Sequence, residues 1–79
     1  MHVKYEDQTG EEKSIDIAYD NSMTVGDFKT ALFDAIGIEG VEREMYVLQS
    51  TGDRPIPGND VNFAKAIGSY TYLELRLVF

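Results

Sequence analysis

Cysteine and tryptophan are absent from the 79-residue chain, which holds only two prolines and one histidine. Without cysteine there are no disulfides and no thiolate metal site, which favours an intracellular, cytoplasmic location. No apolar run approaches the roughly 20 residues of a membrane-spanning helix, and the first five residues lack the apolar stretch of a signal peptide. A chain this short makes one domain, residues 1–79, and we expect no contact with a membrane.

Positive charge is also scarce. The chain has seven lysines and arginines against 14 aspartates and glutamates, a formal net charge of −7. Nucleic-acid phosphates repel such a chain, so nucleic acid is not an expected partner. Residues 1–45 hold 11 of the acidic residues and four basic ones, whereas residues 46–79 hold three of each. A solvated, solubilising surface explains this acidic half more simply than a basic partner does.

Catalytic and ligand-binding patterns are missing as well. His2, the only histidine, begins an expected strand, and the chain offers no second histidine or cysteine for a metal site. No serine stands in a nucleophile motif, and Gly37 and Gly40 lack the lysine and the glycine run of a phosphate-binding loop. We therefore expect no enzyme activity, no metal and no cofactor.

What is present is a succession of periodic segments. Apolar and polar residues alternate over residues 2–6 and again over residues 14–20, with Gly10 in the turn between them, which predicts a β-hairpin. Thr24 and Asp27 then fit a capping box, which predicts the start of a helix. That helix is expected to cover residues 24–36, with one apolar stripe formed by Val25, Phe28, Leu32, Ala35 and Ile36.

The second half of the chain predicts two more long strands. The first covers residues 44–49. Glycine, proline, aspartate and asparagine fill residues 50–60, which predicts a loop with at most a short edge strand at 54–56. A helical turn over residues 61–67 precedes the last strand, residues 70–79, which is the most β-prone segment and is expected in the middle of the sheet.

This order of elements resembles the ubiquitin-like β-grasp superfamily over nearly the whole chain. The residues that carry the resemblance are Thr9 and Gly10 in the first turn, Ile15 and Ile17 in the second strand, Thr24–Val25 and Phe28–Lys29 in the helix, Gly37–Ile38 after it, and Leu73, Leu75, Arg76 and Leu77 at the end. The resemblance implies an α+β fold in which a mixed sheet of four or five strands packs on one α-helix.

In such a fold one face of the sheet meets the helix and the other faces solvent. The inward residues are expected to be Val3, Tyr5, Ile15, Ile17, Phe28, Leu32, Ile36, Ile38, Met45, Val47, Ile67, Leu73, Leu75 and Leu77. The candidate partner-binding residues on the solvent face are Tyr46, Leu48, Tyr72 and Arg76. Tyrosine and arginine are typical of binding hot spots, although tyrosines in strands also simply favour β-structure. Phe33, beside the helix stripe, is expected either to pack under the long loop or to form a second contact.

The chain departs from ubiquitin at positions that matter for its function. It stops at Leu77-Val78-Phe79, where ubiquitin-type modifiers continue to a flexible Gly-Gly tail, so conjugation is not expected. The apolar recognition patch of ubiquitin does not carry over intact either. Gln8, Tyr46 and Arg76 stand at the positions that resemble its leucine, isoleucine and valine.

The expected function is therefore a non-covalent protein–protein interaction module, an adaptor domain whose partner is another protein. Because Met1 precedes the first strand directly, we expect the N-terminal domain of a larger protein. One alternative is a free-standing ubiquitin-like protein similar to the small accessory proteins of bacterial type VII secretion. Two others are a small-GTPase-binding lobe, which the acidic first two strands disfavour, and a conjugated modifier truncated before its tail.

Overall fold

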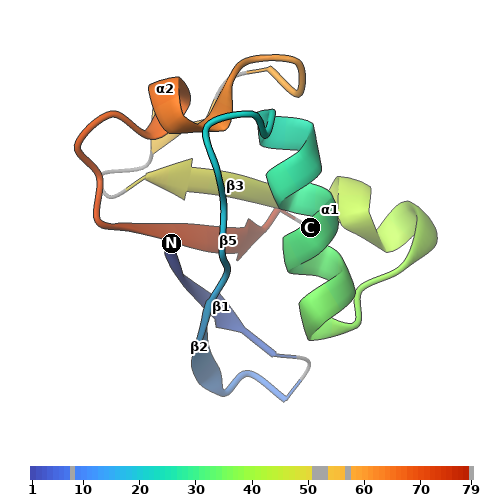
Figure 1. Cartoon of the computed structure of the whole chain (residues 1–79). Helices are drawn as coiled ribbons and strands as arrows, with labels where there is room; N and C mark the ends of the chain where they lie inside the picture. Colours follow the sequence, from blue (N-terminus) through green and yellow to red (C-terminus); the bar gives the residue numbers. More distant parts are fainter. Residues whose placement is uncertain (8, 51–53, 57, 79) are drawn as a thin grey trace.

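The structure, a computed structural model, describes residues 1–7, 9–50, 54–56 and 58–78. Its elements are β1 (His2–Glu6), β2 (Glu12–Asp16), α1 (Val25–Ile36), the 3₁₀ helix η1 (Gly40–Met45), β3 (Tyr46–Ser50), β4 (Arg54–Pro55), α2 (Phe63–Ile67) and β5 (Tyr72–Leu77). Within this described part, the strands form one five-stranded mixed sheet in the order β2-β1-β5-β3-β4 (Figure 1). The fold class is α+β, as predicted.

Pairing in the sheet is antiparallel except between the first and last strands. β1 and β5 run parallel, with Val3 opposite Leu73, whereas β1 with β2 and β3 with β5 are antiparallel. Parallel neighbours need a crossover connection, and α1 lies within that connection. The predicted central position of the last strand is confirmed, because β5 lies between β1 and β3.

Helix α1 begins and ends where its local sequence predicts. The Thr24 hydroxyl accepts a hydrogen bond from the Asp27 amide at 3.1 Å, and the Asp27 carboxylate accepts one from the Thr24 amide at 3.0 Å, so the predicted capping box is confirmed. Gly37 ends the helix with a φ of 82°, a left-handed conformation that favours glycine. Its amide donates to the carbonyl of Phe33 at 2.9 Å.

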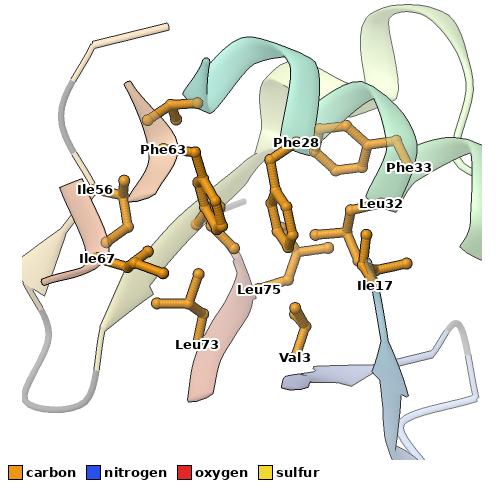
Figure 2. Packing of buried hydrophobic residues seen from close by; sticks show 12 residues of the cluster. Val3, Ile17, Phe28, Leu32, Phe33, Ile56, Phe63, Ile67, Leu73 and Leu75 are labelled. Atoms are coloured by element: carbon orange, nitrogen blue, oxygen red, sulfur yellow. The ribbon is translucent and has the colours of Figure 1, made fainter. Parts of the chain in front are cut away.

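The core lies between the two helices and one face of the sheet (Figure 2). Phe28 of α1 and Phe63 of α2 stack with their ring centroids 3.9 Å apart, and Tyr19 packs edge-on against both rings. The buried apolar residues are Val3, Ile17, Val25, Phe28, Leu32, Phe33, Leu48, Ile56, Phe63, Ile67, Leu73 and Leu75. The predicted core residues Tyr5, Ile15, Ile36 and Ile38 are partly buried against this cluster.

The predicted faces of β3 are wrong. Leu48 lies opposite Leu75 and is only 1 % exposed, so it belongs to the core. Val47, predicted to be a core residue, lies opposite Arg76 on the other face. Tyr46, predicted to lie on the solvent face, is wrong as well. Its side chain is partly buried and packs against the core.

The residues before β3 explain this reversal. Residues 40–45 form η1, so Met45 ends a helical segment rather than starting a strand, and it is 39 % exposed instead of buried. The phase of β3 is then set by its pairing with β5. Leu77, also predicted in the core, is 50 % exposed. The pairing of β1 with β5 stops at Tyr5 and Leu75, which leaves the end of β5 uncovered.

Candidate functional site: the outer face of the sheet

The face of the sheet that points away from the core is defined by the strand register. Because successive side chains in a strand point to opposite sides, the neighbours of buried Val3, Leu73 and Leu75 point outward. This outer face carries His2, Lys4 and Glu6 of β1, Glu12, Ser14 and Asp16 of β2, Tyr72, Glu74 and Arg76 of β5, and Val47 and Gln49 of β3.

Two of the four predicted site residues, Tyr72 and Arg76, lie on the outer face. The other two, Tyr46 and Leu48, do not, because both side chains are on the core side of β3. A partner cannot reach Leu48 in the folded domain, so this residue leaves the candidate site. Val47 takes its place, because it lies directly opposite Arg76.

The middle of the outer face is held by contacts between its long side chains. The Lys4 ammonium lies 4.5 Å from the centre of the Tyr72 ring, in a cation–π contact. Beside them, Gln49 Nε2 donates a hydrogen bond to Glu74 Oε2 at 3.5 Å. Because these side chains are already ordered, a partner that binds here loses less conformational entropy.

The end of β5 adds exposed apolar surface next to Arg76. Leu77 is 50 % exposed and Val78 is 53 % exposed. The Val78 amide donates to the Met45 carbonyl at 2.7 Å. This hydrogen bond brings Met45, which is also exposed, alongside Leu77 and Val78. An arginine among methionine and aliphatic side chains is typical of protein-binding surfaces.

The turn between β1 and β2 is fixed by Asp7. Its carboxylate accepts hydrogen bonds from the Thr9 hydroxyl at 2.6 Å and from the Glu11 amide at 3.0 Å, and the Lys13 ammonium lies 3.1 Å away. The Thr9 hydroxyl, with further help from Lys13 and two backbone amides, holds the pKa of Asp7 well below its usual range. Asp7 in turn raises the pKa of Lys13. The turn is therefore a defined edge of the outer face.

An open groove of about 800 Å³ lies between this hairpin end and the last residues of β5. Its lining residues are Lys4, Tyr5, Glu6, Asp7, Gly10, Glu12, Tyr46, Glu74, Leu75, Arg76 and Leu77. Small-molecule pockets are mostly apolar and enclosing, whereas this groove is open and lined by charges of both signs. It suits a polypeptide segment better than a small ligand.

Phe33 is a core residue and not a second contact site. It is 5 % exposed, and the Arg43 guanidinium lies 5.5 Å from the centre of its ring. Arg43 also donates from Nε to the Ile38 carbonyl at 2.8 Å and forms an ion pair with Asp34. Phe33 is thus covered by Arg43, which ties η1 to the end of α1.

No protein-family model matches the chain, and no curated protein matches it. In the described ranges, no helix combines the length and the apolar character that crossing a bilayer requires. The same ranges contain no group of three or more histidine, cysteine or acidic residues arranged to hold a metal ion.

Proposed function

We propose that this chain is a ubiquitin-like β-grasp domain that binds another protein non-covalently through the outer face of its sheet. The strand order β2-β1-β5-β3-β4 and the parallel β1–β5 pair support the fold assignment. The position of α1 directly after the first hairpin supports it as well. Together with the residues that resemble ubiquitin, these features make the β-grasp the arrangement that best fits the chain.

The observation that carries the function is the composition of the outer face. Val47 lies opposite Arg76, and Tyr72 lies beside Lys4. Tyrosine and arginine are over-represented among the residues that dominate protein-binding energies, because each offers a large contact area with a polar end. The proposed binding residues are Val47, Tyr72 and Arg76, with the exposed Val78 at their edge.

Site-directed crosslinking tests this proposal, because the chain has no cysteine of its own. Single-cysteine variants Ser14→Cys and Glu39→Cys each carry a photo-reactive maleimide and are illuminated in a lysate of the source cells. Ser14 is exposed on the outer face, opposite Lys4, and its replacement leaves the proposed binding residues in place. Glu39 is exposed in the connector after α1, so it controls for chance collisions. We expect a defined adduct from position 14 only.

Alanine variants then test the individual contacts. Tyr72→Ala or Arg76→Ala, added to the Ser14→Cys variant, should each weaken partner binding by about 1 to 3 kcal/mol and so reduce the yield of the adduct. Circular dichroism confirms that each variant is folded. Equal adducts from positions 14 and 39, or a yield that both alanine variants leave unchanged, would move the binding surface away from the outer face.

A further inference from the structure

Strand β2 forms an open edge of the sheet. In the part of the chain that the structure describes, β2 pairs with β1 on one side and with no strand on the other. The Ile17 amide donates to the Met1 carbonyl at 2.9 Å, and the Met1 nitrogen donates to the Ile17 carbonyl at 2.8 Å. At the other end of the hairpin, the Asp7 amide donates to the Glu11 carbonyl at 3.0 Å. The residues that exchange main-chain hydrogen bonds across the hairpin are therefore the odd-numbered ones.

The main-chain groups of the even-numbered residues of β2 point away from β1. This follows because opposite residues of an antiparallel pair alternate between pairs that exchange hydrogen bonds and pairs that do not. The amides and carbonyls of Glu12, Ser14 and Asp16 thus face outward from the open edge, and no main-chain hydrogen bond reaches them from another described segment. A row of such groups is a template to which an extended segment of another chain can add as a further strand.

The side chains of these three residues lie on the outer face, and two of them are carboxylates. Glu12 and Asp16 stand on either side of Ser14, and all three residues are exposed. Asp16 Oδ1 contacts His2 Nδ1 at 2.7 Å, yet the Asp16 side chain stays 82 % exposed. Charged side chains keep an edge strand from pairing indiscriminately. Two carboxylates four residues apart favour a segment whose positions i and i+4 carry the opposite charge.

The inner side of the same edge has a different character. Ile15 is partly buried there and packs against the core. Lys13, opposite Tyr5, lies on this side too, and its ammonium is 3.1 Å from the Asp7 carboxylate. An apolar side chain that lies opposite Ile15 extends the apolar surface, whereas a cation on this side meets the like charge of Lys13. The edge therefore favours cations on its outer side and apolar residues on its inner side.

We infer that the partner adds an extended antiparallel segment to the open edge of β2, with a lysine or arginine opposite Asp16, a second one opposite Glu12 and an apolar residue opposite Ile15. The inference rests on the proposed function and names the chemistry of the partner, because the added strand enlarges the outer face on the side of β2. Antiparallel pairing is the more stable per residue, and it lets Ser14 exchange both main-chain hydrogen bonds with one opposite residue.

Methylated peptides separate strand addition from simple charge attraction. The probe is acetyl-Lys-Val-Thr-Val-Lys-amide, titrated in low salt against the ¹⁵N-labelled full chain. Its threonine is designed to lie opposite Ser14, and we expect it to shift the amide resonances of Glu12, Ser14 and Asp16. Methylation of the threonine nitrogen removes an N–H that donates to β2, and it should weaken binding by about tenfold. Methylation of the first valine nitrogen, whose N–H points away from β2, should weaken binding by less than about twofold.

Two double variants test the charges in the same way. Glu12→Gln, Asp16→Asn should weaken binding of the unmethylated peptide by roughly fivefold. Glu39→Gln, Glu42→Gln removes the same charge from two exposed glutamates in and next to η1, and it should weaken binding by less than about twofold. The amide spectrum of each variant confirms that the fold is native.

Three outcomes would overturn the inference. Equal losses from the two methylated peptides, or from the two double variants, would show attraction by net charge alone. No shift of the edge amides at millimolar peptide would show that β2 does not accept a strand. Shifts at Val47 and Arg76 instead would move the segment to the middle of the sheet and leave the outer face as the binding surface. The yield of the adduct at position 14, with and without Tyr72→Ala, tests the proposed function separately.

Discussion

The two faces of the sheet differ in what their side chains do for the fold. On the inner face Val3 and Leu73 are fully buried and Leu75 is nearly so, as part of the cluster that includes residues of both helices. On the outer face of the sheet, Arg76 of β5 and Glu12 of β2 are exposed. The cost of a substitution follows burial. Changes on the inner face should therefore lower stability, whereas changes on the outer face should alter binding and leave the fold intact.

The largest expected difference in the free energy of unfolding is between substitutions of Leu48 and Val47, two adjacent residues of β3 that lie on opposite faces. Leu48→Ala removes buried methyl groups and leaves a cavity, so the free energy of unfolding should fall by about 2 to 5 kcal/mol. Val47→Ala, on the outer face, should lower it by about 1 kcal/mol or less. Urea titrations followed by circular dichroism measure both values. Equal losses of unfolding free energy would mean that the two side chains are equally buried. The assignment of Leu48 to the inner face and Val47 to the outer face would then be wrong.

The helix that covers the inner face should respond to loss of its capping box. Thr24→Ala removes the hydroxyl that accepts from the Asp27 amide, and it should lower the free energy of unfolding by about 1 kcal/mol. Asp27→Ala should have a smaller effect. The double variant should lose less than the sum, because the two residues share one reciprocal pair of hydrogen bonds. Strict additivity in the same titrations would contradict a reciprocal cap.

The turn at the edge of the outer face should contribute stability that depends on pH. The pKa of Asp7 is below its unfolded value of about 4. Ionised Asp7 therefore stabilises the hairpin above about pH 4, and this contribution is lost as the pH falls through the folded-state pKa. Asp7→Asn should lower the melting temperature at pH 7, and its difference from the parent should shrink below pH 4. A difference that stays constant from pH 7 to pH 2 would exclude the carboxylate as its source.

The smallest expected effect has the opposite sign. Glu12→Gln removes the repulsion between Glu6 and Glu12 on the outer face, so we expect the melting temperature to rise by about 1 to 3 °C. Glu39→Gln makes the same change in net charge away from the sheet and should give a smaller rise. Thermal melts of the two variants, run together in low salt, compare them. A larger rise from Glu39→Gln would show that only the net charge matters.

How far the sequence predicts the structure differs between α1 and β3. The signals of α1 are local, because Thr24, Asp27 and Gly37 each act on residues within one or two turns. Tyr46-Val47-Leu48 are three consecutive apolar residues, so alternation cannot decide which of them faces the core. The residue of β3 that faces the core is set by pairing with β5, which is distant in the sequence and places Leu75 opposite Leu48. Aligning the two strands so that their leucines meet would have given the correct phase.

Other features that the sequence does not predict also depend on contacts between segments distant in the sequence. Phe63 is fully buried, but it lies in a five-residue helix that is too short to show a helical period. The leucines of β5 alternate strictly with other residues, and this alternation predicts the outward positions of Tyr72 and Arg76 that the strand register shows. The groove could not be predicted, since it depends on where β1 stops pairing with β5, a property of the packed sheet.

Thiol labelling tests the assignment of the outer face most directly. The chain has no cysteine, so Val47→Cys, Leu48→Cys and Arg76→Cys each present a single thiol to a maleimide. In native buffer we predict that positions 47 and 76 are labelled readily and that position 48 is labelled at least roughly tenfold more slowly, until urea unfolds the protein. Mass spectrometry of timed samples gives the rates. If Leu48→Cys is labelled as fast as Val47→Cys in a protein with a native circular-dichroism spectrum, β3 presents its other face and the proposed site is wrong.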